Sequence, residues 1–267
     1  MVAAYRNVLD YFKSIKLIMG LAKRDFMTRY IGSYFGVLWS IVSPIITILV
    51  YWFVFEKGLR ASAPTENTPF ILWFISGIIP WFFFSDSLNG ATNSFFEYSY
   101  LVKKVLFRIS ILPIVKIVSN FFIHFLFLVI LVCLFIAYGR PFSIYYLQVL
   151  YYSFSMFILL IAISWITASI ILFFRDMGQI ISILLQFGMW LTPIAWPSTI
   201  LPDNLEPFFK LNPVYYIVEG YRDSMINHIW FFHRYNQTMY FWILTICLLF
   251  LGFFIFKKLK PHFSDVL

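Results

Sequence analysis

Charged residues are scarce in this chain. Only 12% of its 267 residues are Asp, Glu, Lys or Arg, about half the share found in a soluble domain, while 61% are hydrophobic. A soluble fold needs charged side chains to cover its surface, and a disordered chain needs low hydrophobicity. The composition therefore excludes both a soluble globular enzyme and an intrinsically disordered protein.

Motifs for nucleotides and metals are also missing. A P-loop requires a glycine followed directly by lysine, and no glycine in this sequence has lysine as its next residue. The histidines are scattered, at His124, His228, His233 and His262, without metal-ligand spacing. Cys133 and Cys247 lie in separate apolar runs and indicate no disulfide framework. We therefore expect no catalytic, cofactor or metal site and no enzyme activity in this chain.

Long apolar runs dominate what is present. Since about 20 helical residues cross a hydrocarbon core of about 30 Å, each run is a candidate span. The runs are solidly apolar rather than alternating, which favours helices over barrel strands. The sequence predicts an all-α integral membrane protein with six transmembrane helices, of which the sixth is the shortest: Tyr34–Phe55, Phe70–Leu88, Ile117–Tyr138, Ile144–Phe174, Met177–Trp196 and Met239–Phe256.

The distribution of basic residues predicts the orientation. Six spans place both termini on one side, and that side carries 14 Lys and Arg against 6 on the other. Cytoplasmic loops are enriched in these residues, so both termini are expected in the cytoplasm. The net charge of +8 then reflects orientation and attraction to membrane lipids, and no nucleic-acid partner is needed.

Residues 1–33 precede the six-helix domain, residues 34–267. Apolar residues such as Leu9, Phe12 and Leu21 alternate with basic ones at helical spacing, which predicts an amphipathic helix in the cytoplasmic interface. This helix either anchors the chain or also contacts a partner.

Two cytoplasmic connections carry further candidates. The longer one contains Lys103, Lys104 and Arg108 among apolar residues, and the tight one contains Arg175 and Asp176. These charges either serve orientation alone or form docking contacts for a cytoplasmic subunit.

The external segment before the last span, about residues 197–238, is rich in Phe, Tyr and Ile. Leu205–Leu211 and Tyr215–Met225 each predict a short helix, separated at Asn212 by the proline that follows it. We expect two re-entrant half-helices that dip into the outer leaflet.

Glu219, Arg222 and Asp223 fall on one face of the second half-helix, because they are three and four residues apart. That face is either solvated or lines an exit path. His124 is the one ionisable ring at membrane depth and is read either as structural or as a proton relay. A relay would indicate an ion-coupled carrier, and a membrane-embedded enzyme would need clustered acids that the sequence lacks.

Ordered short motifs resemble the permease subunits of polysaccharide-exporting ABC transporters. They run from about residue 20 to the C-terminus at suitable spacing. The motif residues are Arg29, Tyr30, Ser33, Gly36, Trp39 and Pro44; Gly77, Pro80, Trp81 and Phe84; Lys104, Arg108 and Pro113; Phe173, Phe174, Arg175 and Asp176; Pro193 with Asn212 and Pro213; and Lys260, Pro261, His262 and Phe263.

The resemblance implies a homodimer of this chain bound to two copies of a cytoplasmic ABC ATPase subunit, in a bacterial plasma membrane. ATP and Mg would bind to the partner, and a lipid-linked polysaccharide would move outward. The implied contacts with the ATPase subunit are Arg29, Tyr30, Lys103, Lys104, Arg108, Arg175 and Asp176.

The branch of the family decides the expected cargo. The run from Tyr51 to Pro64, with Asn212–Tyr215 and Tyr221–Arg222, resembles wall teichoic acid permeases, so teichoic acid is the first expectation. O-antigen or capsular polysaccharide is the alternative, followed by small lipids or drugs.

Aromatic side chains would line the passage, because sugar rings stack on them weakly at many sites. The candidates are Tyr34, Trp39, Trp81, Phe187, Trp190 and Trp196, with Glu219, Arg222 and Asp223 as an external gate. Each aromatic residue has a plain alternative, in the interfacial belt or in helix packing.

Overall fold

The computed structural model of the chain describes residues 2–29, 34–60, 63–65, 68–102, 108–200, 202 and 204–266, with side chains from residue 15 onward except 264 and 265. Its regular structure is helical throughout the described ranges. The α-helices are α1 (Val2–Thr28), α2 (Trp39–Trp52), α3 (Phe70–Glu97), α4 (Ser99–Val102), α5 (Leu112–Ala137), α6 (Gln148–Ile171), α7 (Met177–Leu191), α8 (Glu206–Lys210), α9 (Pro213–Arg222), α10 (Tyr235–Leu259) and α11 (Phe263–Val266).

Five helical segments are long and apolar enough to cross a membrane. With their flanking short turns they are Gly36–Gly58, Phe70–Glu97, Ile109–Ala137, Ile144–Ile171 and Phe231–His262. The sixth predicted span corresponds to α7, which has 15 residues. That length covers only about 22 Å of the roughly 30 Å core, so a count of six full spans is not confirmed.

The prediction that the last span is the shortest is wrong. The last helix, α10, has 25 residues and continues past both predicted ends. It takes in the polar residues Asn236 and Gln237 at one end and Lys257 and Lys258 at the other. Polar side chains ended the apolar run in the sequence, but they do not end a helix.

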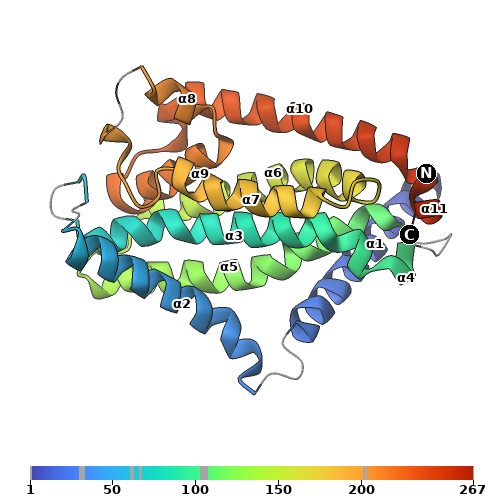
Figure 1. Ribbon diagram of the computed structural model, residues 1–267, viewed down its shortest axis with the longest axis horizontal. Helices are drawn as coiled ribbons and strands as arrows, with labels where there is room; N and C mark the ends of the chain where they lie inside the picture. The colour runs from blue at the N-terminus through green and yellow to red at the C-terminus, as the bar shows by residue number, and fades with distance from the viewer. Residues whose placement is uncertain are drawn as a thin grey trace.

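The centre of the bundle is α3. In its most apolar stretch 78% of the residues are buried inside the chain, against 11% in the segment that contains α2. Helices α5, α6, α7 and α9 all pack against α3, and α6 pairs with α10. Figure 1 shows α3 running between α2, α5 and α7. The first span thus lies at the edge of the bundle and exposes most of its apolar surface.

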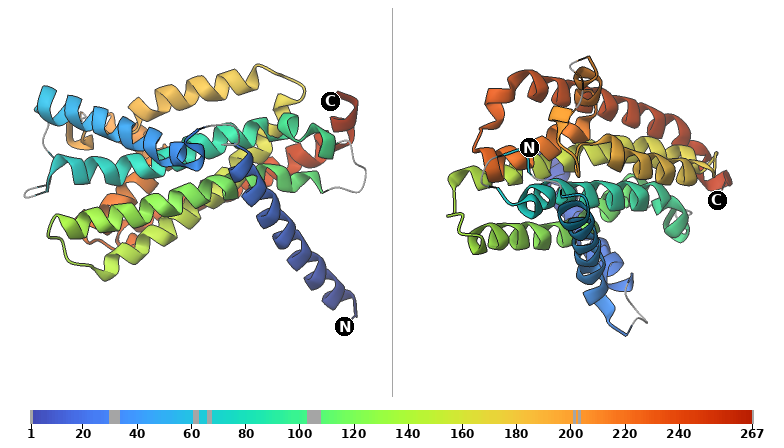
Figure 2. Two further views of the ribbon diagram at one scale, coloured as in Figure 1. Left: turned by 90° about the horizontal axis from the view of Figure 1, so that it is seen from below. Right: turned by 60° about the vertical axis from the view of Figure 1, so that its left-hand side comes forward.

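The two ends of the bundle differ. Helices α1, α4 and α11 gather at one end together with both termini, and the α8–α9 segment lies at the other (Figure 1). Helix α1 leaves the bundle at a steep angle (Figure 2). The two ends of the chain therefore lie at the same end of the bundle along its long axis, and their placement in the cytoplasm stays a prediction.

The segment before α10 folds as two short helices. Helix α8 covers Glu206–Lys210, and α9 begins at Pro213, where the Asn212 side chain accepts a hydrogen bond from the backbone N–H of Val214 at 2.9 Å. Asparagine is a favoured N-cap, and proline is tolerated in the first turn. Helix α9 packs on α3 and α6 within the bundle, so the predicted helix–turn–helix is confirmed in its boundaries to within about two residues.

Candidate functional site

The first part of the site is a charged junction where α1, α3 and α5 meet. Asp25 of α1 is 6% exposed. Its carboxylate accepts hydrogen bonds from Lys116 Nζ at 2.5 Å and from the Tyr98 hydroxyl at 2.6 Å, and it pairs with Arg29 at 3.3 Å. Lys116 also pairs with Glu97. Because buried charges of opposite sign cannot be separated cheaply, this junction ties the interface helix to the two central spans.

The pKa of Asp25 reflects these partners. Burial acts to raise it, but the hydrogen bonds from Lys116 and Tyr98 stabilise the charged form and leave the pKa below its ordinary value of 3.8. The carboxylate is therefore ionised at neutral pH. The junction is therefore an ionic link between the helices at neutral pH.

The second part is an aromatic face on α2 and α7. Trp190 is 51% exposed and Phe187 is 63% exposed, both on α7, while Tyr34 and Trp39 are exposed at the start of the α2 segment. Seen from below, α2 and α7 lie on the same side of α3 (Figure 2, left), whereas in Figure 1 α7 lies above α3 and α2 below it. The structure therefore leaves four of the six predicted path residues exposed at α2 and α7, which both pack against α3.

Trp81 departs from this pattern. It is 5% exposed, and its ring packs against Gly188 of α7, where an added Cβ would lie 2.9 Å from the ring. The glycine lets α7 approach α3 closely. Trp81 therefore packs between α3 and α7 and does not face an open passage in this chain. This is the helix-packing role that was the alternative to a place in the passage.

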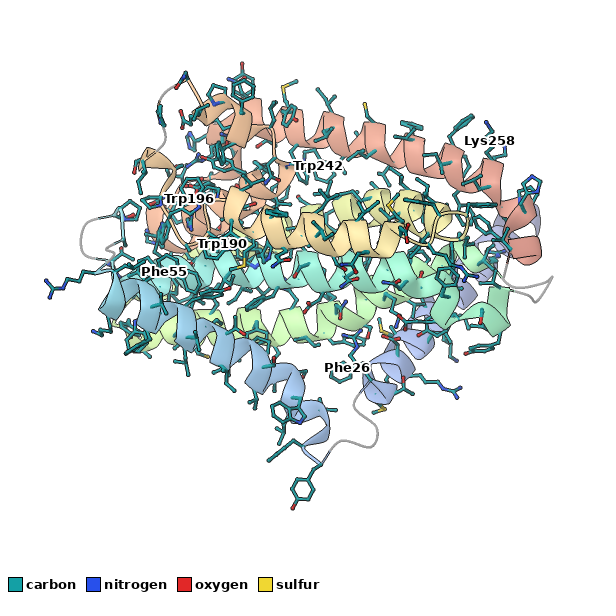
Figure 3. The ribbon with its side chains drawn as sticks, viewed as in Figure 1. Phe26, Phe55, Trp190, Trp196, Trp242 and Lys258 are labelled. Carbon is teal, nitrogen blue, oxygen red and sulfur yellow. The ribbon has the colours of Figure 1, made fainter. Side chains whose placement is uncertain are left out.

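Trp196 follows α7, which ends at Leu191. Its indole N–H donates to the Trp190 carbonyl at 3.0 Å, and Asn212 donates to the Thr192 hydroxyl at 2.9 Å. Figure 3 shows Trp190 and Trp196 at the same end of the bundle as Phe55. The residues after α7 are thus held to that helix and to the start of α9.

Arg222 forms the strongest anchor at this end. It is 2% exposed and donates to the Pro193 carbonyl at 2.7 Å, the Ile194 carbonyl at 2.8 Å and Glu219 at 2.7 Å. Its guanidinium also stacks over the Trp73 ring on α3, with 3.7 Å from its carbon to the ring centroid. One side chain thereby joins α9, α3 and the segment that follows α7.

Asp223 is buried as well, but its partners differ. Its carboxylate pairs with Arg234 and accepts from Asn227 at 2.9 Å, next to the start of α10. The ion pair between Glu219 and Arg222 agrees with their placement on a shared face. The solvated interpretation fails for Arg222 and Asp223, because both side chains are enclosed by protein.

The predicted ATPase contacts fall in three groups. Arg175 and Asp176 are exposed on the tight turn between α6 and α7, and Arg108 is exposed before α5. Arg29 turns inward and donates to the Asn120 side-chain oxygen at 2.7 Å. Tyr30, Lys103 and Lys104 lie outside the described residues.

No group of three metal-ligating side chains occurs within the ranges that the structure describes. His124 is 3% exposed, and its Nε2 lies 2.9 Å from the Tyr221 hydroxyl and 3.2 Å from that of Ser153. Both neighbours of Nε2 are hydroxyl groups, and neither is the acidic partner that a proton relay would use.

Comparison with known proteins now identifies the family. A family described as ABC-2 type transporter matches residues 16–226, well over half of the chain. The chain belongs to the ABC-2 type transporter family. In the part of the chain that the structure describes, its helical bundle contains five helices of membrane-spanning length. This agrees with the helical membrane fold that the sequence predicts.

Curated relatives refine this assignment. Two proteins from Klebsiella pneumoniae named O-antigen export system permease protein RfbA are 28% and 27% identical to this ABC-2 chain over 255 residues, covering 94% of the chain and 95% of each relative. A Myxococcus xanthus protein of the same name is 29% identical over 232 residues, covering 84% and 85%. These relatives, whose names describe export permeases, match this ABC-2 chain along most of its length.

Sequence reasoning missed the partners that hold this ABC-2 bundle together. Asp25, Lys116 and Trp73 were not singled out, since each is an isolated residue in its own run. A buried acid on an otherwise basic helix and a lone Lys at the start of a span were the available signals. Their pairing depends on the tertiary fold.

Proposed function

We propose that this chain is the transmembrane permease subunit of an ATP-driven exporter that moves a lipid-linked polysaccharide of the O-antigen type out of the cytoplasm. The observation that carries the proposal is the match to three O-antigen export permeases along most of the chain. These relatives favour O-antigen over wall teichoic acid, so the first expectation from the sequence is replaced by its alternative.

The energy source lies on a partner in this proposal. Two copies of the chain bind two ABC ATPase subunits, and ATP and Mg bind only to those subunits. The exposed pair Arg175 and Asp176, together with Arg108, supports a docking surface at the end that holds both termini. Both termini then face the cytoplasm of a bacterial plasma membrane.

The polymer passes along the aromatic face in this proposal. Trp39, Phe187 and Trp190 present flat apolar rings that stack on the C–H faces of sugars, and many weak contacts let a long chain slide. A second copy of the permease encloses this face. Apolar side chains exposed along α2 and α7 support such a partner, since lipid or protein must cover them.

The external gate is proposed as a movable hairpin. Glu219 and Arg222 belong to α9, whose anchor on Pro193 and Ile194 holds the end of α7. Release of these contacts would free the outer end of the path. Asp223 holds the other end of the hairpin to Arg234.

A genetic test separates this proposal from the alternatives. Deletion of the gene in its bacterial host is expected to remove polysaccharide from the cell surface and leave lipid-linked polymer inside, and a plasmid copy should restore export. Normal surface polysaccharide with loss of a small lipid or drug efflux would contradict the proposal.

A further inference from the structure

A polar stripe runs along the second half of α3. Asp86, Asn89, Asn93 and Glu97 are three or four residues apart and so share one face of the helix. They border a cleft of about 650 Å³, together with Asp25, Arg29 and Lys116 from α1 and α5. Sites for small ligands commonly measure about 300–1,000 Å³. The stripe is unexpected, because α3 is otherwise the most buried of the long helices.

A smaller cavity of about 170 Å³ adjoins the cleft on the side toward the middle of the spans. It shares Arg29 and Asp86 with the cleft and is also lined by Trp39, Asn120 and His124. We call the cleft and this cavity together the polar notch. It begins at the charged junction and reaches the aromatic residue at the start of α2.

Two buried polar groups that line the inner cavity lack partners. Asn120 is 3% exposed, and its amide nitrogen has no hydrogen bond to the described part of the chain, although its oxygen accepts from Arg29. His124 is equally buried, and Nδ1 has no partner there, whereas Nε2 faces Tyr221 and Ser153. Unpartnered buried polar atoms are uncommon in folded proteins. Both are therefore positioned to bond a ligand oxygen.

The charges of the notch select the type of ligand. Lys116 already pairs with Asp25 and Glu97, and Arg29 with Asp25, so both cations are compensated. Asp86 has no ion pair to any residue in the described ranges. An incoming phosphate would meet this carboxylate, and the described cations that border the notch, Arg29 and Lys116, are already paired with acids. A sugar hydroxyl can donate to Asp86 and accept from the Asn120 amide.

We propose that the polar notch binds a neutral sugar ring of the lipid-linked glycan before export. Asp86 accepts hydroxyl protons, Asn120 and His124 bond to ring or hydroxyl oxygens, and the exposed Trp39 ring covers a C–H face. The diphosphate of the lipid stays outside the notch, at the membrane surface. This inference rests on the proposed export of a lipid-linked polysaccharide and adds the part of the cargo that the chain recognises.

Equilibrium binding to the full complex with its ATPase in lipid nanodiscs, without ATP, tests the proposal. Two probes with a fluorescent polyprenyl tail are compared, one a diphosphate that carries a neutral hexose oligosaccharide and the other the same diphosphate without sugar. We expect the sugar-bearing lipid to bind at least about tenfold more tightly to the wild-type complex. Asp86→Asn should weaken that binding roughly tenfold, the usual effect of a lost charged hydrogen bond, and leave the sugar-free lipid unchanged.

Asn120→Leu should act in the same direction, and Asn236→Leu on the exposed first turn of α10 is the matched control. Should Asn120→Leu fail to fold, Asp86→Asn still decides, because the Asp86 side chain is exposed and makes no hydrogen bond or salt bridge to the described residues. Unchanged glycan binding in Asp86→Asn, or an equal loss of binding for both lipids, would contradict sugar binding in the polar notch. The proposed export function would not be affected by that result. A wild-type complex that binds neither lipid would overturn the proposed function as well.

Discussion

The guanidinium carbon of Arg222 lies 3.7 Å from the centroid of the Trp73 ring. The same guanidinium donates to two carbonyls that follow α7 and to Glu219 on its own helix. Close approach of α9 to α3 at this point depends on Gly77, where an added Cβ would lie 2.9 Å from Arg222. The outer end of the bundle thus depends on one buried cation.

Arg222→Met is expected to destabilise the protein strongly. The change leaves Glu219 without its cation and two carbonyls without donors, and breaking a buried pair costs about 3–5 kcal/mol. Thermal unfolding of the purified protein in detergent measures the loss. Lys210→Met is the control, since its exposed pair with Glu206 contributes about 0–1 kcal/mol. Equal melting temperatures for the two variants would contradict this role of Arg222.

Gly188→Ala should separate α7 from α3. The added methyl would lie 2.9 Å from the outer carbon of the Trp81 ring, which has no room to move in its buried position. We expect a loss of about 1–3 kcal/mol, and recovery when Trp81→Phe removes the outer ring. Thermal unfolding of the single and double variants checks this.

Gly20→Ala is the control for the Gly188 change. No atom lies within 4 Å of an added Cβ there, so alanine should be neutral or stabilise α1 slightly. A double variant no more stable than Gly188→Ala would refute the proposed clash.

The Asp25 junction predicts acid sensitivity. The pKa of Asp25 is lowered in the folded protein, so its ion pairs stabilise the fold above about pH 4 and this contribution is lost as the pH falls further. Asp25→Asn should be less stable at pH 7 by about 1–3 kcal/mol, because its buried partners lose a charged acceptor. It should also lose less stability than the wild type as the pH falls from 5 to 3. Unfolding measured against pH in both proteins tests the sign. A variant with the same pH slope as the wild type would exclude Asp25 as the titrating group.

Trp39→Ala and Trp190→Ala should each reduce polysaccharide export by about tenfold or less without preventing assembly with the ATPase. Each removes one of several stacking contacts worth about 0.5–1.5 kcal/mol. Surface polymer and co-purified ATPase are measured together. Trp242→Ala, which removes an N–H donor to Tyr151 away from this face, is the comparison. Full export in both path variants would argue against a path along α2 and α7.

The sequence predicted those parts of the fold that depend on continuous apolar runs. Long runs specify membrane helices because only a helix satisfies its own backbone in lipid. The Asn212-Pro213 pair likewise fixed the start of α9, since capping is a local effect. The helical fold, the N-terminal helix and the two half-helices were thus accessible before the structure.

Side-chain pairing was not accessible in this way. Nothing in the runs themselves indicates that Trp81 faces Gly188 rather than an open passage, because the α3 residues around Trp81 are apolar on both faces. The partners of Asp25 lie 73 and 91 positions away. The polar stripe from Asp86 to Glu97 has helical spacing, but its meaning depends on the cleft formed by α1 and α5.

Transport in proteoliposomes tests the central claim most directly. The chain is reconstituted alone or with its ATPase partner, and the movement of a lipid-linked O-antigen polysaccharide across the bilayer is followed with and without ATP and Mg. The account predicts ATP-dependent movement only when both subunits are present, and no nucleotide hydrolysis by the chain alone. Hydrolysis or polymer movement by the isolated chain would contradict it.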